Sequence, residues 1–418
     1  MTPVFIVIGM TTAIAIFISP LFGLALTFIL IPISTQLTMG GSFLGIFSMV
    51  TPIKIIGSLT FISTLIHYSG SKNTWGFLKK PQIRFFLFFL IWIFISGFTQ
   101  SGFATRENFT MFIANSILGL TILILIREIK KLRLMLWIIA ISIFFICLQT
   151  ILSYLGIGRA GGTGYGPNEF AITILPFIAV TFYMSLTERN GILKLILIGI
   201  TTAVFFALLS TVSRGGIIGL GGMLLILILK SKKRIVTIIS VCILAVIFTN
   251  TMPQNLRERF SKTQVTANAR GIGDGDIDST TRRYNLAQAG WRIFLNHPVF
   301  GIGIGNYYYE NRFYAPVHPG RAHNMYLEIM AELGLIGILL FLGIIFHTFK
   351  SLNRIIKANN IFSGYARGFY IGLVGFLIAG IFLHAQQDRI LWFLIFMSAA
   401  LENIAFPKPE LQKVKKND

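Results

Sequence analysis

The sequence is poor in charged residues and in cysteine. Only 12% of its 418 residues are Asp, Glu, Lys or Arg, about half the share found in a soluble globular domain. Its two cysteines, Cys147 and Cys242, lie inside apolar runs, so the sequence predicts neither a disulfide framework nor a zinc site. The first residues are apolar, without a basic region or a small-residue cleavage site, and we interpret them as a retained span instead of a signal peptide.

The sequence is rich in long apolar runs. Hydrophobic residues make up 54% of the chain, and 39 residues are Phe. Apolar runs of about 15–24 residues recur between short charged or glycine-containing breaks, and roughly 20 such residues cross the hydrocarbon core of a bilayer. The sequence therefore predicts an all-α, polytopic integral membrane protein. Pro20 either divides two short spans or kinks one long one, so we expect 12 or 13 transmembrane helices. The predicted spans are 4–18, 21–37, 51–67, 85–99, 111–126, 134–156, 169–186, 193–210, 215–229, 235–250, 325–349, 362–384 and 390–406.

Lysine and arginine are distributed unevenly among the breaks. From residue 51 onward, breaks with several basic residues alternate with breaks that hold one. Short cytoplasmic loops concentrate Lys and Arg, so we expect the poor breaks on the outer, periplasmic side. Because the net charge of +21 is spread between apolar runs and forms no single stripe, it indicates topology and not a nucleic-acid partner. The rich breaks are 68–84, 127–133, 188–194, 230–234, 350–357 and the C-terminal tail; the poor ones hold Arg106, Arg159, Arg214 and Arg389.

One long segment, 251–324, lies between two poor breaks and is therefore expected to be a large periplasmic loop. It separates an N-terminal bundle of spans, 1–250, from the C-terminal spans and cytoplasmic tail, 325–418. The loop holds nine basic residues against five acidic ones. Long loops escape the positive-inside rule, so this excess indicates either anion binding or a solvated surface.

The stretch "DSTTRRYNLAQAGWRIFLNHP" in this loop has the pattern of an amphipathic helix, with Pro298 after its end. Such a helix would hold Arg282, Arg283 and Arg292 close to the lipid headgroups. Its apolar residues form a stripe that either lies on the membrane surface or packs on the spans. They are Tyr284, Ala287, Trp291 and Phe294 or Leu295.

Three features on the predicted outer side have complementary chemistry. Arg214 lies in "STVSRGG" between two spans, and Arg282 and Arg283 open the loop helix. His323 precedes the next span. Arginine binds phosphate oxygens in a bidentate manner, and histidine takes up a proton near neutral pH. Together they suit transfer of a group from a lipid-linked phosphate or pyrophosphate, because arginines can stabilise the leaving group while a histidine deprotonates the nucleophile.

These residues also have structural interpretations. A lone arginine in a short outer loop is often an interfacial residue with its charge in the headgroup layer, and a histidine at a helix start can serve as a cap. Glu328 and Glu332 lie one helical turn apart on the face of Asn324. They either orient the site or form one water-exposed turn.

Two further patterns fail as cofactor motifs. "GIGIGNY" follows a helix and lacks the strand–turn–helix unit of a dinucleotide loop. "DGDID" lacks the glycine and the twelfth-position glutamate of a calcium loop. We therefore expect no metal site and no cofactor.

The residues from His323 onward resemble the signature of a known family. "HNMYLEIMAELGLIG" has the form H-N-x9-G-x-x-G, with His323, Asn324, Gly334 and Gly337. "RRYNLAQAGWRIFLNHPVFGIGIGNY", "SRGG" and "GTGYGPNEFA" are similar to further elements of the same family. Over residues 160–340 the combination resembles the O-antigen ligase and polymerase superfamily of bacterial membrane glycosyltransferases.

The resemblance implies a reaction and roles for its residues. Members of this family transfer a glycan from undecaprenyl pyrophosphate to an acceptor hydroxyl on the periplasmic side, without metal or nucleotide. His323 would be the catalytic base, and Arg214 and Arg283 would bind the donor pyrophosphate. Arg283 is preferred to Arg282 because its spacing to Pro298 fits the family pattern.

The remaining residues of the signature receive supporting roles. Asn324 joins the substrate-binding set, and Glu328 and Glu332 would keep the histidine or its neighbours in place. Gly334 and Gly337 would allow close approach of another helix or a lipid chain. Direct displacement by the acceptor hydroxyl would invert the anomeric centre.

The sequence thus predicts an enzyme of the bacterial inner membrane, embedded in lipid and active at the periplasmic face. We favour an O-antigen ligase of lipopolysaccharide biosynthesis that acts on a lipid A–core acceptor. A polymerase that extends O-antigen or exopolysaccharide on the lipid carrier would use the same site with a lipid-linked glycan as acceptor. The alternative from another class is a transporter or flippase for lipid-linked glycan, which would place ionisable residues near the middle of several spans; here they cluster at span ends.

Overall fold

A computed structural model describes residues 2–31, 51–70, 75–98, 103–157, 166–230, 235, 279–315 and 319–407. Within these ranges every regular element is a helix, and there is no strand. The prediction of an all-α, polytopic membrane protein is confirmed. The predicted span 235–250, apart from its first residue, and the acidic "DGDID" stretch lie outside the described residues.

The helices begin and end within a few residues of most predicted spans. The N-terminal helices are α1 (Thr2–Ile18), α2 (Pro20–Leu30), α3 (Pro52–Tyr68), α4 (Pro81–Gly97), α5 (Phe103–Leu125), α6 (Ile129–Ile157), α7 (Pro167–Thr187), α8 (Gly191–Ser210) and α9 (Arg214–Lys230). The C-terminal helices are α12 (Ser279–Asn296), α13 (Tyr307–Glu310), α14 (Met325–Lys357), α15 (Ser363–Ala379) and α16 (Arg389–Ala405), and short 3-10 turns occupy Gly76–Lys79 and Asn311–Phe313.

Proline defines several of these boundaries. It occupies the first turn of α2, α3, α4 and α7, where its missing N–H breaks no hydrogen bond. At Pro20 the Ser19 side chain accepts a hydrogen bond from the backbone N–H of Phe22 (3.4 Å) and caps the new helix. Pro20 therefore divides two helices and does not kink a single one.

Five helices within the described ranges are long and apolar enough to cross a membrane. They are Asn108–Leu125 of α5, Ile129–Tyr154 of α6, and α7, α8 and α14. Four shorter segments, Val7–Ile18 of α1 and the helices α2, α4 and α15, are also apolar. The total of 12 or 13 spans stays a prediction.

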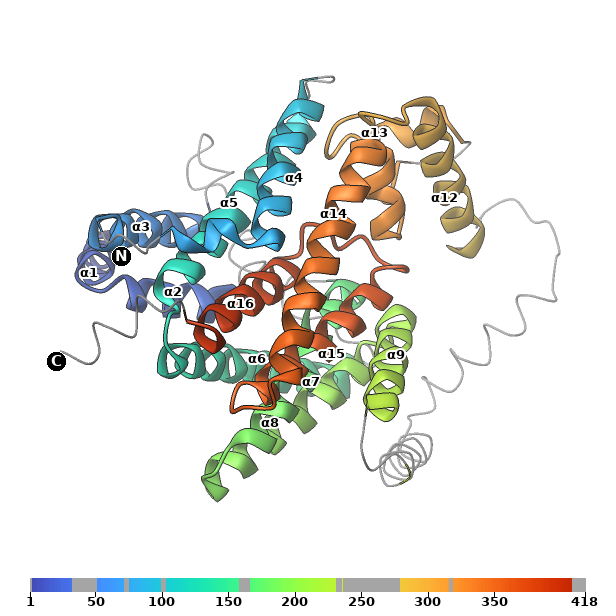
Figure 1. The fold of residues 1–418 in the computed structure, drawn as a ribbon. Coiled ribbons are helices and arrows are strands. Elements are labelled where there is room, and N and C mark those ends of the chain that lie inside the picture. The colour runs from blue at the N-terminus through green and yellow to red at the C-terminus, as the bar shows by residue number, and fades with distance from the viewer. Residues whose placement is uncertain are drawn as a thin grey trace.

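The helices pack around α14 and α16. In Figure 1, α14 (orange) runs through the middle of the molecule, with α12 beside its N-terminal end and α16 and α15 next to its lower part. Every residue of α16 from Ile390 to Leu401 is buried, as expected for a helix that is apolar all round. The Trp392 ring lies 5.1 Å from Phe86, 6.1 Å from Phe89 and 5.8 Å from Phe112 (ring centroids), so it joins α4, α5 and α16.

The C-terminal end of α16 carries a charged cluster far from the loop at its N-terminal end. The Glu402 carboxylate lies 2.5 Å from the Lys80 ammonium and 3.9 Å from the Arg354 guanidinium. Lys80 and Arg354 come from two of the breaks that are rich in basic residues. Those two breaks therefore meet at one end of the bundle.

α14 is interrupted at Gly334. This residue has φ 66° and ψ −166°, a conformation that glycine adopts without the steric cost other residues incur. The break separates a short segment, 325–333, from the apolar stretch 335–357. Glu328 and Glu332 both lie on the short segment, which explains how two glutamates can precede so apolar a helix.

The turn after α12 fills this break. Its backbone pairs with groups of α14 that the interruption leaves without helical partners. A Cβ at Gly334 would lie 2.1 Å from the carbonyl oxygen of Val299. The expectation that Gly334 lets another helix or a lipid chain approach is therefore wrong, because the close neighbour is loop backbone. The hydrogen bonds run from Leu335 N to Pro298 O (2.7 Å), from Ile302 N to Ala331 O (3.1 Å) and from Gly303 N to Glu332 O (2.9 Å).

Candidate active site

The loop helix α12 packs through a different face from the predicted apolar stripe. Leu286, Ala289 and Ile293 are buried, whereas Tyr284 and Trp291 of the stripe are 63% and 50% exposed. Tyr284 and Trp291 therefore do not pack on the spans that the structure describes. The stripe is free to lie on the membrane surface, while the opposite face holds the helix against α14.

A short buried turn places Arg214 at the start of α9. Ser213 caps the helix, since its hydroxyl accepts a hydrogen bond from the backbone N–H of Gly216 (3.3 Å), and its own N–H donates to the Thr211 hydroxyl (3.2 Å). Val212 has a φ of 54°, which is rare for a β-branched residue and marks local strain. The Arg214 side chain leaves this rigid turn on its exposed side.

His323 lies directly before α14 in a second strained turn. Its φ is 50°. Asn324 is the N-cap of the helix, because its Oδ1 accepts hydrogen bonds from the backbone N–H groups of Tyr326 and Leu327, both at 3.0 Å. The cap is therefore Asn324 and not the histidine. Of the Asn324 amide, only the NH2 group remains for a substrate.

The Nδ1 atom of His323 is buried and has no hydrogen-bond partner among the described residues. Burial is the main cause that lowers the pKa of His323 to about 4, and the charge of Arg283 is the next. Glu328 acts in the opposite direction. The imidazole is thus neutral at neutral pH and able to accept a proton.

The two arginines interact as well. Burial, followed by the positive charge of Arg214, lowers the pKa of Arg283. Arg283 in turn acts on His323. Arg283 therefore lies close enough to interact electrostatically with both Arg214 and His323, which come from separate parts of the sequence.

The neighbouring arginines of α12 differ in their contacts. The Arg282 guanidinium donates to the carbonyl oxygen of Pro319 (3.2 Å), which ties α12 to the loop before His323. Arg283 has no hydrogen-bond partner among the described residues, and its interactions are with Arg214 and His323. Arg282 thus makes a structural contact, whereas the choice of Arg283 over Arg282 as the donor-binding residue stays a prediction.

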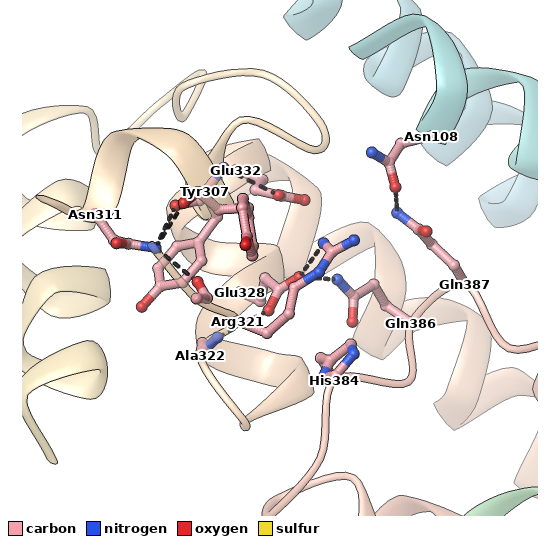
Figure 2. A network of polar contacts seen from close by, with 12 residues as sticks. Asn108, Tyr307, Asn311, Arg321, Ala322, Glu328, Glu332, His384, Gln386 and Gln387 are labelled. Atoms are coloured by element: carbon pink, nitrogen blue, oxygen red, sulfur yellow. Dashed lines mark hydrogen bonds and ion pairs between the residues drawn. The ribbon is translucent and has the colours of Figure 1, made fainter. Parts of the chain in front are cut away.

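Glu328 fixes the loop that carries His323. Its side chain is fully buried. One oxygen accepts hydrogen bonds from the Arg321 guanidinium (2.9 Å) and the Gln386 amide (2.8 Å), and the other accepts from the backbone N–H of Ala322 (3.1 Å). Figure 2 shows Arg321 and Gln386 converging on this carboxylate. Glu328 thus binds the two residues before His323, while leaving the imidazole itself free.

Glu332, one turn further along α14, binds the turn after α12. Its Oε1 accepts a hydrogen bond from the backbone N–H of Tyr307 (3.3 Å). The Tyr307 hydroxyl donates to the carbonyl oxygen of Leu286 in α12 (2.5 Å). Glu332 therefore links α14 to the helix that carries the arginines, and its second oxygen is buried without a partner in the described part of the chain.

Comparison with known proteins adds to this geometry. A family model described as O-Antigen ligase matches residues 195–342, a range that contains Arg214, Arg283 and His323. The chain is also similar to the teichuronic acid biosynthesis protein TuaE of Bacillus subtilis (strain 168), with 25% identity over 235 residues. The resemblance to the O-antigen ligase and polymerase superfamily is confirmed. That alignment covers 52% of this chain and 46% of TuaE, so the chain spans about half the length of the relative it matches.

The superfamily signature did not indicate every polar residue around His323. Arg321, Gln386 and His384 received no role from the sequence, although the loop between α15 and α16 reads "HAQQD". A cluster of polar residues in a short loop between two predicted spans was the available signal. The first part of the superfamily element "GTGYGPNEFA" lies outside the described residues, but its Glu169 is described and lies 3.6 Å (Oε1) from the Nε2 atom of His384.

Proposed function

We propose that this chain transfers a glycan from undecaprenyl pyrophosphate to an acceptor hydroxyl at the periplasmic face of the bacterial inner membrane. The observation that supports this most is that Arg283 interacts electrostatically with both Arg214, at the start of α9, and His323, directly before α14. Two permanent positive charges next to a neutral imidazole suit an anionic leaving group and a nucleophile that must lose a proton.

In this reaction the acceptor oxygen attacks the anomeric carbon while His323 takes the hydroxyl proton. The bond between the anomeric carbon and the pyrophosphate oxygen breaks, and its electron pair leaves with the lipid pyrophosphate. Arg214 and Arg283 stabilise the negative charge that develops there. Because the displacement is direct, the anomeric centre is inverted. The two guanidinium groups provide the charge compensation, so the proposal requires neither a metal nor a cofactor.

Donor binding would strengthen the base. In the free protein, the charge of Arg283 contributes to the low pKa of His323. A bound pyrophosphate neutralises that charge and adds negative charge of its own, so the pKa of His323 rises. The imidazole thus becomes a better proton acceptor when the donor is in place.

The exposed face of α12 supports a location at the lipid–water boundary. Tyr284, Trp291 and Leu295 are all at least half exposed, and aromatic residues favour the headgroup layer. With this face on the membrane, Arg283 on the same helix would be held close to the lipid headgroups. A lipid-linked pyrophosphate occurs in that layer.

Two acceptors fit the same chemistry. The family model's description as O-antigen ligase favours a lipid A–core acceptor. The relative's name, a teichuronic acid biosynthesis protein, favours synthesis of another polysaccharide and therefore a polymerase with a lipid-linked glycan acceptor. We retain the ligase as the first candidate and the polymerase as the second.

The test uses the purified chain in proteoliposomes with undecaprenyl-pyrophosphate glycan and either lipid A–core or a second lipid-linked unit. We expect product that is unaffected by EDTA, lost in His323→Ala and retained in the control His297→Gln. Product on lipid A–core alone would identify a ligase, and product on the second unit alone a polymerase. Glycan that crosses the vesicle membrane with its pyrophosphate linkage intact would replace the proposal with a transporter. Normal turnover by His323→Ala would exclude His323 as the base.

A further inference from the structure

A second imidazole faces His323 across the outer end of the bundle. His384 lies in the loop between α15 and α16, and its ring centroid is 5.7 Å from that of His323 with an interplanar angle of 69°. The Nδ1 atoms of both rings are buried without hydrogen-bond partners among the described residues. At this separation one hydroxyl or water can bridge two ring nitrogens.

The position of His384 is fixed from two sides. Its Nε2 lies 3.6 Å from the Oε1 of Glu169, in the first turn of α7. Two residues further along the same loop, the Gln386 amide donates to the Glu328 carboxylate (2.8 Å), and Figure 2 shows His384 next to this contact. The loop is thus bound to the same buried carboxylate that holds the residues before His323.

We propose that His384, oriented by Glu169, is a positioning and proton-relay residue that receives the proton His323 takes from the acceptor hydroxyl. The inference rests on the proposed function. The Glu169 carboxylate lies 3.6 Å from Nε2 of His384, and its negative charge favours the tautomer with the proton on Nε2, which leaves a lone pair on the buried Nδ1 atom.

The charges around the two rings favour this direction of transfer. His323 faces Arg283, Arg282 and His384 as well as Glu328, and Arg283 contributes more than the glutamate. Among the described residues, the charges that act on His384 are two carboxylates, Glu328 and Glu169, and one cation, Arg321. Burial lowers the pKa of both imidazoles. The positive charge of a transferred proton is nevertheless better balanced on His384, because two carboxylates act on that ring.

The relay balances without any further reactant. The hydroxyl proton binds one ring nitrogen of His323, and the proton on the other ring nitrogen passes to His384, directly or through one water. His384 then exists as an imidazolium next to the Glu169 carboxylate. Glu169 is half exposed, so the proton leaves to solvent and both histidines return to their neutral forms.

The activity test compares His384→Gln, His384→Ala and Glu169→Gln with the control His297→Gln, whose imidazole lies 3.1 Å from the Tyr314 hydroxyl elsewhere in the outer segment. We expect kcat to fall about tenfold to a hundredfold in His384→Gln, with the KM for the donor changed less than about threefold. Added imidazole should restore turnover of His384→Ala. A purely structural role would not give this rescue, so its absence would overturn the relay.

A second readout needs no substrate. Because His384 contributes to lowering the pKa of His323, the His323 resonance should titrate at higher pH in His384→Gln than in the wild type, as measured by NMR in nanodiscs. An unmoved titration would overturn the pairing of the rings, whatever the activity. Absence of glycan transfer by the wild type with a shifted titration would refute the proposed function while leaving the coupled imidazole pair in place.

Discussion

The charge of Arg283 can be tested directly through the ionisation of His323. The pKa of this imidazole lies at about 4, against an ordinary value of 6.5. At about 1.4 kcal/mol per pKa unit, protonation of His323 costs roughly 3 kcal/mol more than protonation of a free imidazole. Burial lowers this pKa most, and Arg283 has the largest effect among the neighbouring charged groups.

Replacement of Arg283 by glutamine removes that charge and keeps most of the side-chain volume. The pKa of His323 should rise, because a like charge next to the imidazolium is lost. The pKa should not return to the ordinary value of 6.5, because His323 stays buried in the variant. We expect about one pKa unit. Arg282→Gln is the matched control, because Arg282 contributes least among the groups that shift the pKa of His323. This variant should therefore raise that pKa much less than Arg283→Gln does.

The assay is an NMR titration of the histidine resonances between pH 3 and 8 in nanodiscs. The chain has six histidines, and the spectrum of His323→Gln assigns the relevant resonance. A His323 titration that is identical in Arg283→Gln and the wild type would refute the reasoning, because the two side chains would then not share a site. A larger effect of Arg282→Gln would exchange the roles of the two arginines.

Three further outcomes follow from the same contacts. Gly334→Ala should lower the thermal unfolding midpoint, because its Cβ would lie 2.1 Å from the Val299 carbonyl oxygen. The control Gly221→Ala adds a carbon with no atom within 4 Å and should leave the midpoint unchanged. Equal midpoints for the two variants would contradict the close packing of the turn after α12 against Gly334. Glu328→Gln should destabilise the fold by about 3 kcal/mol and abolish glycan transfer, as measured by a denaturation series with parallel activity assays. A variant as stable and active as the wild type would show that the Glu328 carboxylate does not hold the loop before His323. In the pH profiles of transfer, the acid limb of kcat should lie at higher pH than the acid limb of kcat/KM. Donor binding raises the pKa of His323, and kcat reports the donor-bound enzyme whereas kcat/KM reports the free enzyme. Acid limbs at the same pH would contradict binding of the donor pyrophosphate by Arg283.

The sequence was sufficient to predict most of the described helices and the places of His323 and Arg214 in the candidate site. Apolar length and helix-initiating prolines define the spans, as at Pro20, because both act locally. The H-N-x9-G-x-x-G pattern located His323 at a helix start, and the Ser-Arg-Gly element located Arg214. The electrostatic contact between these two regions through Arg283 was expected from topology, since outer loops share one face of the membrane.

Contacts that depend on packing could not be predicted. The packed face of α12 is one example: Leu286, Ala289 and Ile293 have helical spacing just as Tyr284 and Trp291 do, so periodicity could not choose between the two faces. The break at Gly334 is another. Its non-helical conformation depends on a turn that precedes it by about 35 residues, and a helical pattern with one glycine shows no sign of that turn.

His384 illustrates a third limit. It closes an apolar run that has the pattern of a span, and the polar "HAQQD" stretch that it begins does not indicate which residue it contacts. Its approach to His323 follows from the packing of α15 and α16 against α14 and from the hydrogen bond between Gln386 and Glu328. Residues brought together in this way can be found only once the helices are placed.

Under the proposed function, the buried groups that would perform the chemistry are separate from the exposed ones that could select an acceptor. The loop that carries His323 is held by the buried contacts of Glu328, so a change there would disturb the proposed base for every acceptor. The side chains of Tyr308, Tyr309 and Phe313, in the turns between α12 and α14, are exposed and support none of these contacts. A ligase and a polymerase can therefore share the buried network and differ in the exposed turns. Exchange of Tyr308, Tyr309 and Phe313 for the residues at the same positions of a second such enzyme should alter acceptor choice while leaving the pH dependence of transfer unchanged, and a shifted pH profile would contradict their separation from the buried network.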